Sequence, residues 1–355
     1  MKHLNTRFLL LALVVLAVLS SCRKDKTNPA TSTPTAQRKG IYILNQGNFG
    51  TPNSTLTYYN YTTKTSVPDQ FSAVNGRVLG DVGNDVEIYG SKMYIVVNVS
   101  STLEVVNAQT GKSIQQISFM NSGQAREPRY VVFNKGLAFV SSYDGTVAVI
   151  DTASLTVKQY INVGRNPEHL AIANNKLYVA NSGGLSYPNY DKTVSVIDLN
   201  TLTVTKTITV PVNPNSVVAD AYGNVYVQSA GDYTSANPNS LSIINSSTDQ
   251  VVSSAAFDGS SLFIQGDNLY CITSDNKIKV VNTRTQAISQ SNFISDGTVI
   301  KTPYYISVDG TTGEVFVADA KDYASSGTVT AFDKNGKKEY SLTAGISPGS
   351  IAYLY

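Results

Sequence analysis

The chain has 355 residues, which is enough for one large domain or two ordinary ones. Only 15% of the residues are charged, Tyr occurs 22 times and Trp is absent. Seven of the 27 basic residues and one of the 25 acidic residues precede residue 40, so residues 40–355 carry 20 basic and 24 acidic side chains. This mildly acidic body has no basic stripe, so nucleic acid is not an expected partner.

The N-terminal segment has the parts of an export signal in order. Lys2 and Arg7 precede an apolar stretch, Phe8–Leu19, that is too short to span a bilayer as a helix. It ends in Leu-Ser-Ser-Cys22, which resembles a bacterial lipobox, whose cysteine is lipidated. We therefore predict a lipoprotein signal peptide over 1–21 and membrane attachment through lipid on Cys22. The alternative is an ordinary signal peptide followed by a chance cysteine.

Residues 22–39 contain two prolines and no apolar periodicity, which predicts a lipidated, disordered tether. Arg23 stands where an inner-membrane retention signal usually places Asp. Lys24-Asp25 partly resembles the acidic export tag of surface lipoproteins in Bacteroidetes-type bacteria. We therefore expect an outer-membrane lipoprotein of a diderm bacterium that faces the cell exterior, with a periplasmic orientation as the alternative.

After residue 40 the sequence repeats. Short β-type runs of the form Tyr-Val-x-Asn, such as "IYILN" and "LYVAN", place an aromatic residue at 42, 94, 139, 178, 226, 270 and 316, with spacings of 39 to 52 residues. In each unit a further β-type run, such as "TVAVID", ends in Asn or Asp, and a small residue, usually Thr or Ser, stands three positions later. This combination is a hairpin turn signal. Units of 40 to 50 residues that each hold several short strands are typical of a β-propeller.

A Pro or Gly step opens each complete unit, and the unit at Tyr42 lacks this opening strand. The C-terminal run "ISPGSIAYLY" supplies the missing pattern at Pro348. We therefore predict an all-β, seven-bladed propeller over 40–355, with four-stranded antiparallel blades and a ring closed by the C-terminal strand pairing into blade 1. Closure removes an exposed sheet edge. The second cysteine, Cys271, lies in a strand-like run and is expected to be a small buried hydrophobe.

The Tyr-Val-x-Asn and Val-Ile-Asp pattern resembles the YVTN-type, surface-layer-like seven-bladed propellers over essentially all of 40–355. A lipobox, a polar tether and such a propeller in one chain also resemble the surface propeller lipoproteins of Bacteroidetes-type bacteria. Some members of that group capture cobalamin and pass it to an outer-membrane transporter. The resemblance implies a small-molecule ligand, with cobalamin as the candidate, and a transporter as partner.

Antiparallel pairing places the start of each inner strand and the loop after each second strand on the same face of the disc. The starts of the inner strands are expected to ring the channel mouth with Asp85, Arg129, Tyr130, Glu168, His169, Asn215, Tyr304 and Tyr305. Four long loops on that face carry Phe49, Tyr187, Tyr190, Tyr233 and Tyr323. Tyr combines a broad apolar surface with a hydroxyl at low entropic cost, so we predict that these residues bind a ligand.

Other functions have weaker support in the sequence. Asp85, Glu168 and Asn215 offer oxygen ligands for a cation such as Ca²⁺, which a lactonase-type hydrolase would use, but Arg129 lies among them. We expect no catalytic residues, no resident metal and no cofactor. The leading hypothesis is a lipid-anchored propeller that captures a small bulky nutrient, with cobalamin as lead, for a transporter. A protein-docking or glycan-binding scaffold is the alternative, and a hydrolase is third.

Overall fold

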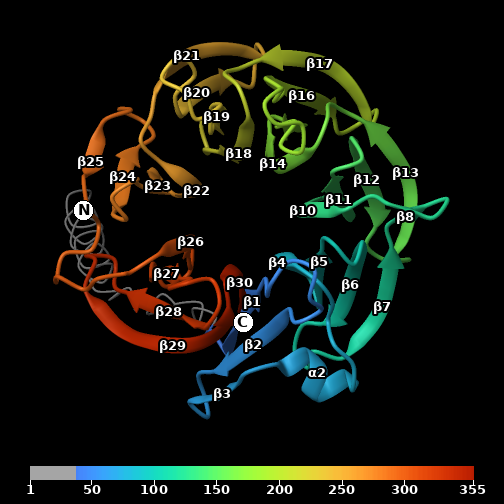
Figure 1. Cartoon of the computed structure of the whole chain (residues 1–355), viewed down its shortest axis with the longest axis vertical. Coiled ribbons are helices and arrows are strands. Elements are labelled where there is room, and N and C mark those ends of the chain that lie inside the picture. The colour runs from blue at the N-terminus through green and yellow to red at the C-terminus, as the bar shows by residue number, and fades with distance from the viewer. Residues whose placement is uncertain (1–36) are drawn as a thin grey trace, which may run out of the picture. The chain divides into compact units, whose positions relative to one another are not determined.

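The repeat folds into seven four-stranded antiparallel sheets arranged as a ring (Figure 1). The computed structural model describes residues 37–355, so the predicted signal peptide and Cys22 lie outside the described residues. Each sheet is one blade. Its first strand lies nearest the central channel and its last strand lies at the rim (Figure 1). The predicted all-β seven-bladed propeller is therefore confirmed.

Six blades are continuous in sequence. Blade 2 contains β4 (Gly83–Tyr89), β5 (Lys92–Val97), β6 (Thr102–Asn107) and β7 (Ser113–Ser118). Blade 3 contains β10 (Pro128–Asn134), β11 (Leu137–Ser142), β12 (Thr146–Asp151) and β13 (Thr156–Asn162). Blade 4 contains β14 (Pro167–Ala173), β15 (Lys176–Asn181), β16 (Thr193–Asp198) and β17 (Thr203–Thr209). Blade 5 contains β18 (Pro214–Ala219), β19 (Asn224–Ser229), β20 (Ser240–Asn245) and β21 (Gln250–Ala256).

The other two of these blades follow the same order, with a shorter rim strand in blade 6. Blade 6 contains β22 (Ser260–Gln265), β23 (Asn268–Ile272), β24 (Ile278–Asn282) and β25 (Ile288–Gln290). Blade 7 contains β26 (Pro303–Val308), β27 (Val315–Asp319), β28 (Ser326–Phe332) and β29 (Lys338–Ile346). A small hairpin of β8 (Met120–Asn121) and β9 (Gln124–Ala125) links blades 2 and 3, and a short helix, α2 (Gln70–Asn75), links blades 1 and 2.

Blade 1 joins both ends of the described chain. It contains β30 (Pro348–Leu354), β1 (Gly40–Asn45), β2 (Thr55–Asn60) and β3 (Thr65–Val67). The innermost strand β30 pairs antiparallel with β1, from Gly40 opposite Leu354 to Asn45 opposite Pro348. The predicted closure of the ring by the C-terminal strand is therefore confirmed.

The propeller includes residues that precede the expected boundary at residue 40. The Lys39 N–H bonds the Leu354 carbonyl at 2.7 Å and so extends the β1–β30 pairing. Arg38 is buried and forms ion pairs with Asp309 and Glu314, each at 2.5 Å. Arg38 and Lys39 therefore belong to the propeller, although the sequence placed them at the end of the tether.

The outer hairpins form at the predicted Asx turns. In blade 3 the Asp151 carboxylate accepts hydrogen bonds from the N–H groups of Ala153 at 3.0 Å and Ser154 at 2.8 Å. The next residue, Leu155, then adopts a left-handed conformation with φ of 57°. This is the pattern of a type I turn closed by a left-handed residue, and it keeps these connections short. The same Asx bonds recur at Asn60, Asn107, Asp198, Asn245 and Asn282.

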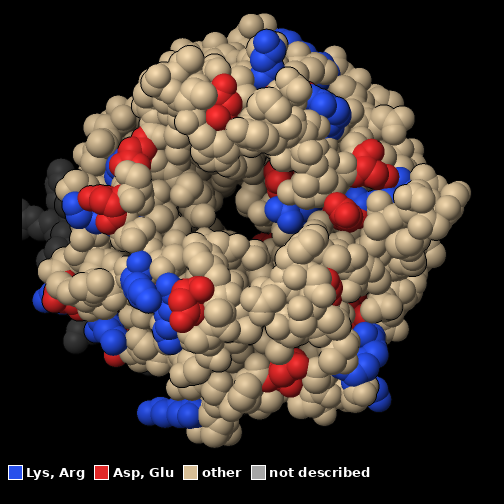
Figure 2. All heavy atoms as spheres, viewed as in Figure 1, with Lys and Arg blue, Asp and Glu red and all other residues tan. Residues whose placement is uncertain are grey.

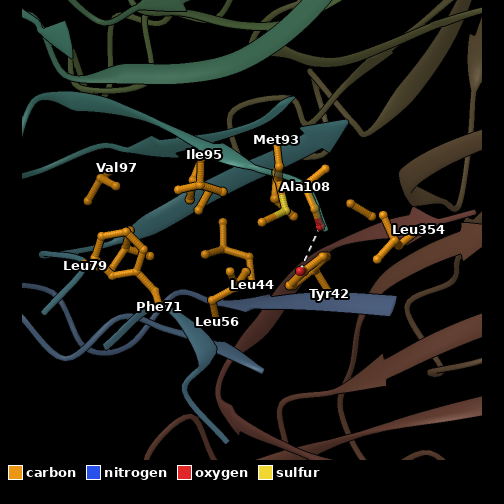
Figure 3. Packing of buried hydrophobic residues seen from close by; sticks show 13 residues of the cluster. Tyr42, Leu44, Leu56, Phe71, Leu79, Met93, Ile95, Val97, Ala108 and Leu354 are labelled. Carbon is orange, nitrogen blue, oxygen red and sulfur yellow. Dashed lines mark hydrogen bonds between the residues drawn. The ribbon is translucent and has the colours of Figure 1, made fainter. Parts of the chain in front are cut away.

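The aromatic residue of each second strand packs in the core between neighbouring blades. Figure 3 shows Tyr42 among Leu44, Met93 and Leu354, with its hydroxyl donating to the Ala108 carbonyl at 2.8 Å. Tyr178 and Tyr226 likewise fill apolar space while their hydroxyls bond carbonyls of the next blade, at Ser246 and Thr283. The aromatic side chains at this repeat position are among the largest fully buried ones, so they supply much of the core in a chain without Trp.

The connections divide the disc into two faces. The four long loops after β1, β15, β19 and β27 share one face with the starts of the inner strands, which we call the loop-rich face. The opposite face carries the hairpins after the inner strands and the Asx turns, and we call it the short-turn face. The chain enters β1 from the short-turn face, because the long β1–β2 loop leaves it on the other side. No helix within residues 37–355 has the length and apolar character to cross a membrane.

Candidate functional site

The first residues of the inner strands converge at the channel mouth, as the repeat predicted. One cavity of about 170 Å³ is lined by residues from six blades: Gln46, Asn84, Tyr130, His169, Ser261, Leu262, Tyr304, Tyr305, Ile306 and Gly349. Figure 2 shows the hollow at the centre of the ring, with mostly uncharged side chains around it. The structure therefore brings four predicted site residues, Tyr130, His169, Tyr304 and Tyr305, around one space.

Arg129 and Glu168 form a closed polar network beside this cavity. The Arg129 guanidinium lies 2.9 Å from one Glu168 oxygen and 2.5 Å from the Asn84 amide oxygen. The other Glu168 oxygen accepts a hydrogen bond from the Tyr143 hydroxyl at 2.5 Å. Burial favours the neutral form of Arg129, but the charge of Glu168 and the neighbouring phenols dominate and raise the Arg129 pKa. The charges of Arg129 in blade 3 and Glu168 in blade 4 thus neutralise each other, and Asn84 links this network to blade 2.

His169 is held as a neutral imidazole. Its Nδ1 lies 2.7 Å from the Asn215 carbonyl, which can only accept, so Nδ1 carries the proton. Its ring stacks on Tyr130, with centroids 3.6 Å apart. Burial lowers the His169 pKa to about 4, and nearby Arg129 adds to the effect. At neutral pH the ring therefore presents an unprotonated Nε2 that accepts hydrogen bonds. Asn215 contributes its carbonyl to this arrangement.

Asp85 points into the seams between blades. One oxygen accepts the Val131 N–H at 3.0 Å and the other accepts the Ser350 hydroxyl at 3.0 Å. Burial raises the Asp85 pKa to about 6, because desolvation outweighs these hydrogen bonds. Glu87, two residues further along β4, lines the channel, where enclosure by the ring and then the charge of Asp85 raise its pKa. Asp85 thus joins blades 1, 2 and 3.

The loop aromatics form two groups above the mouth. In the loops of blades 4 and 5, Tyr190 makes edge contacts with Tyr187 at 6.0 Å and with Tyr233 at 6.4 Å between ring centroids. In the loops of blades 7 and 1, Tyr323 packs edge-on against Tyr304 at 5.6 Å, and its carbonyl accepts the Asn48 amide. Phe49, next to Asn48, is 84% exposed. The centres of the two groups are three blades apart in the seven-bladed ring, with blade 6 between them on one side and blades 2 and 3 on the other, so they stand nearly opposite each other.

Of the three residues considered as cation ligands, the two carboxylates have other side-chain or backbone partners, and Asn215 is engaged through its backbone carbonyl. Glu168 bonds Arg129 and Tyr143, Asp85 bonds Val131 and Ser350, and the Asn215 carbonyl bonds His169. Within residues 37–355, no group of three or more His, Cys, Asp or Glu side chains gathers in a way that could hold a metal ion. The arrangement therefore offers hydrogen bonds and aromatic contact, rather than a set of converging carboxylates.

Two site residues were missed by the sequence reasoning. The Gln46 side chain lines the cavity and accepts a hydrogen bond from the Tyr304 hydroxyl at 2.8 Å. Tyr143 holds Glu168, and the Arg129 guanidinium carbon lies 4.6 Å from its ring centroid. Both residues follow the repeat aromatic by four positions, so alignment of the repeats would have selected them.

Comparisons with known proteins place this fold in a wider group. A family model described as "Domain of unknown function (DUF5074)" matches residues 39–353. No curated protein matches the chain. A solved structure titled as a quinonprotein alcohol dehydrogenase-like protein from Bacteroides thetaiotaomicron has 16% identity and a TM-score of 0.65, covering 89% of this chain and 78% of that one. Hydrazine synthase from Kuenenia stuttgartiensis has 15% identity and a TM-score of 0.63, covering 76% of this chain and 89% of that one. Likeness at this identity shows the fold alone.

Proposed function

The chain belongs to the DUF5074 family, and we propose that it binds a small, bulky nutrient on its loop-rich face. The observation that carries this proposal is the convergence of Tyr130, His169, Tyr304 and Tyr305 on one cavity beneath two opposed groups of exposed loop aromatics. Pockets of this kind, aromatic with a few placed polar groups, suit capture of a ligand.

The size of the cavity indicates how the ligand binds. A volume of about 170 Å³ is below the range of pockets that enclose a drug-sized molecule. A bulky ligand therefore lies across the mouth, with one projecting polar group in the cavity. Gln46, Asn84 and the Nε2 of His169 bond that group, while Tyr187, Tyr233 and Phe49 cover the apolar surfaces.

The lead candidate is a corrinoid such as cobalamin, a broad molecule with apolar faces and projecting amide groups. The YVTN-type pattern and the predicted lipid anchor at Cys22 support this choice through resemblance to surface propeller lipoproteins. In this proposal the protein is anchored in the outer membrane, faces the cell exterior and delivers its ligand to a transporter. Its role is binding, without catalysis.

The test is titration of the purified protein with cobalamin by calorimetry. We expect binding that weakens about tenfold or more in the double variant Tyr187→Ser with Tyr233→Ser, because interface aromatics carry much of the binding energy. The control is Ile114→Ser with Val204→Ser, which also removes two exposed apolar side chains, but from the rim strands β7 and β17, away from the channel mouth. Absence of binding at high micromolar concentrations of cobalamin would contradict the proposal that the ligand is a corrinoid.

A docking or glycan-binding scaffold is the second candidate. It is favoured by the strong exposure of Phe49, Leu185, Tyr187 and Tyr233 on one face, a pattern that also marks protein interaction sites. A pull-down from outer-membrane extract, repeated with the Tyr187→Ser and Tyr233→Ser variant, separates this function. A partner lost in that variant, together with no cobalamin binding, would favour the scaffold.

A further inference from the structure

Neighbouring blades are joined at the channel mouth by a repeated contact. Counting the Pro or Gly step as the first residue, the third residue of most inner strands reaches a neighbouring blade, and its contact lies beside the cavity. Between blades 1 and 2 the Val86 N–H donates to the Ser350 hydroxyl at 3.2 Å, and between blades 2 and 3 the Val131 N–H donates to Asp85 at 3.0 Å. Tyr130 of blade 3 stacks on His169 of blade 4 with ring centroids 3.6 Å apart, and His169 Nδ1 lies 2.7 Å from the Asn215 carbonyl of blade 5. Between blades 6 and 7 the Ser261 hydroxyl donates to the Tyr304 carbonyl at 3.3 Å. Between blades 7 and 1, the contact is instead the hydrogen bond that the Tyr304 hydroxyl donates to the Gln46 side-chain oxygen.

Ser216 breaks this pattern between blades 5 and 6. It occupies the same repeat position, and it shares a strand face with Val218, which packs against the blade 6 residues Leu262 and Cys271. Yet its hydroxyl has no hydrogen-bond partner among the described residues, although the side chain is only 4% exposed. A buried polar group without a partner costs free energy, so this junction is weakened where the others are strengthened.

The seam between blades 5 and 6 combines the unpartnered Ser216 hydroxyl with a cavity further from the channel. This cavity of about 270 Å³ separates blade 5, at Leu241 and Ile243, from blade 6, at Val281 and Ile288. Most of its lining is apolar, so the two blades lose van der Waals contact there. The rim strand of blade 6, β25, has three residues and gives this side little cover. The larger hollow of about 510 Å³ between blades 7 and 1 lies at a seam whose mouth is closed by the Tyr304–Gln46 hydrogen bond.

The short-turn side of the seam is held firmly. The Tyr226 hydroxyl bonds the Thr283 carbonyl of blade 6 at 3.1 Å, as Tyr42 does between blades 1 and 2. Tyr222 adds a bond to Asp267 at 2.5 Å. On the loop-rich side the link is the Asn239 amide to the Gly259 carbonyl at 3.0 Å. The seam between blades 5 and 6 therefore has strong hydrogen bonds at the short-turn face and fewer contacts at the loop-rich face.

We propose that the ring opens in the native state at the seam between blades 5 and 6, hinging on the short-turn face and parting at the loop-rich face. Ser261 and Leu262 of blade 6 line the mouth cavity, so their displacement widens it. Opening admits groups larger than the closed cavity of about 170 Å³ holds. The motion follows from the seam itself and does not depend on which ligand the face binds.

Cys271 allows a direct test, because it is fully buried in this seam against Tyr226 and Leu262. In the protein carrying Cys22→Ser it is the single thiol. The control carries Cys271→Val and Val179→Cys, which moves the thiol to the equivalent, equally buried position in blade 4, facing blade 3. Reaction with Ellman's reagent is followed at low urea in both proteins.

We expect Cys271 to react at least about tenfold faster than the control thiol, with a rate that depends less on urea, because local opening exposes less surface than global unfolding. Equal rates with the same urea dependence would overturn the proposal. Amide hydrogen exchange of the protein without the Cys271→Val and Val179→Cys substitutions provides an independent test of the same proposal. Faster exchange in β22 and β23 than in β14 and β15 supports seam opening, and equal protection contradicts it.

A second variant tests the cause. Ser216→His supplies the contact that His169 makes in blade 4, with the Ser260 carbonyl as acceptor. We expect Cys271 to react about fivefold more slowly in this variant, the effect of one hydrogen bond. An unchanged rate in a folded Ser216→His protein would overturn the role assigned to Ser216.

Discussion

At the scale of residues, one repeat position performs different tasks in different blades. The third residue of the inner strand is Asp85 in blade 2, His169 in blade 4 and Ser216 in blade 5, and of these only Asp85 and His169 hydrogen-bond to the next blade. In the sequence Glu168 and His169 are adjacent polar residues, which could suggest a pair acting together. In the structure Glu168 turns to Arg129 and Tyr143, while His169 turns to Tyr130 and Asn215. Adjacent residues of a strand point to opposite sides, so the pair never forms.

The lowered pKa of His169 predicts a pH dependence of stability. Its folded pKa of about 4 lies below the ordinary value of 6.5, so the unfolded chain binds the proton more readily. The contribution of His169 to stability is therefore full above pH 6.5 and is lost progressively as pH falls from 6.5 to 4. Urea unfolding of the parent and of His169→Gln across this range should show the difference between them shrinking toward low pH.

The comparison with His169→Gln is needed because the pKa shift of Asp85 changes the free energy of unfolding with pH in the opposite direction to that of His169. Its folded pKa of about 6 exceeds the ordinary value of 3.8, so its contribution is present below pH 3.8 and is lost as pH rises through 6. A difference between parent and His169→Gln that stays constant from pH 7 to 4 would contradict the assigned neutral state of His169.

At the scale of elements, the strand pair β30 and β1 closes the ring. β30 supplies Ser350 to the mouth and Ile351, Ala352 and Leu354 to two core clusters. Without it, β1 would expose a row of unpaired backbone groups, and blade 7 would lose the Ile351 side chain from the apolar cluster that it shares with blade 1. Closure therefore acts on the stability of the whole ring.

Deletion of Gly349–Tyr355 should abolish cooperative thermal unfolding, measured by circular dichroism. The matched control shortens the β8–β9 hairpin by replacing Met120–Ala125 with Asn-Gly. This hairpin pairs with itself, and the Arg126 N–H already bonds the Phe119 carbonyl at 2.9 Å, so a two-residue turn fits. A native-like melt of the C-terminal deletion would contradict the role given to closure.

At the scale of the propeller as a whole, the proposed binding face lies opposite the face where residues 38 and 39 lead into β1. Arg38 is clamped by Asp309 and Glu314 in the β26–β27 hairpin, and Lys39 bonds the Tyr355 carbonyl, both on the short-turn face. A protein tethered through its N-terminus would therefore present its long loops outward, which suits capture of a ligand from the surroundings.

This geometry predicts which additions are tolerated. A folded domain fused in place of residues 1–36 should leave the affinity for cobalamin within about twofold, because it adds bulk on the short-turn side. The same domain inserted in the β15–β16 loop between Tyr187 and Tyr190 should abolish binding. Calorimetric titration of both fusions measures this, and an N-terminal fusion that blocks binding would contradict the assignment of faces.

The sequence by itself determined the blade count, the ring closure and which connections share the loop-rich face, because each depends on a local pattern repeated around the ring. It placed Tyr130, His169, Tyr304 and Tyr305 together for the same reason. The partners within the site were decided by the tertiary structure, because Arg129, Asn84 and Glu168 come from three blades and meet through side-chain directions that spacing does not encode. The unpartnered Ser216 belongs to this second class, since whether its hydroxyl is satisfied depends on what the next blade places opposite it.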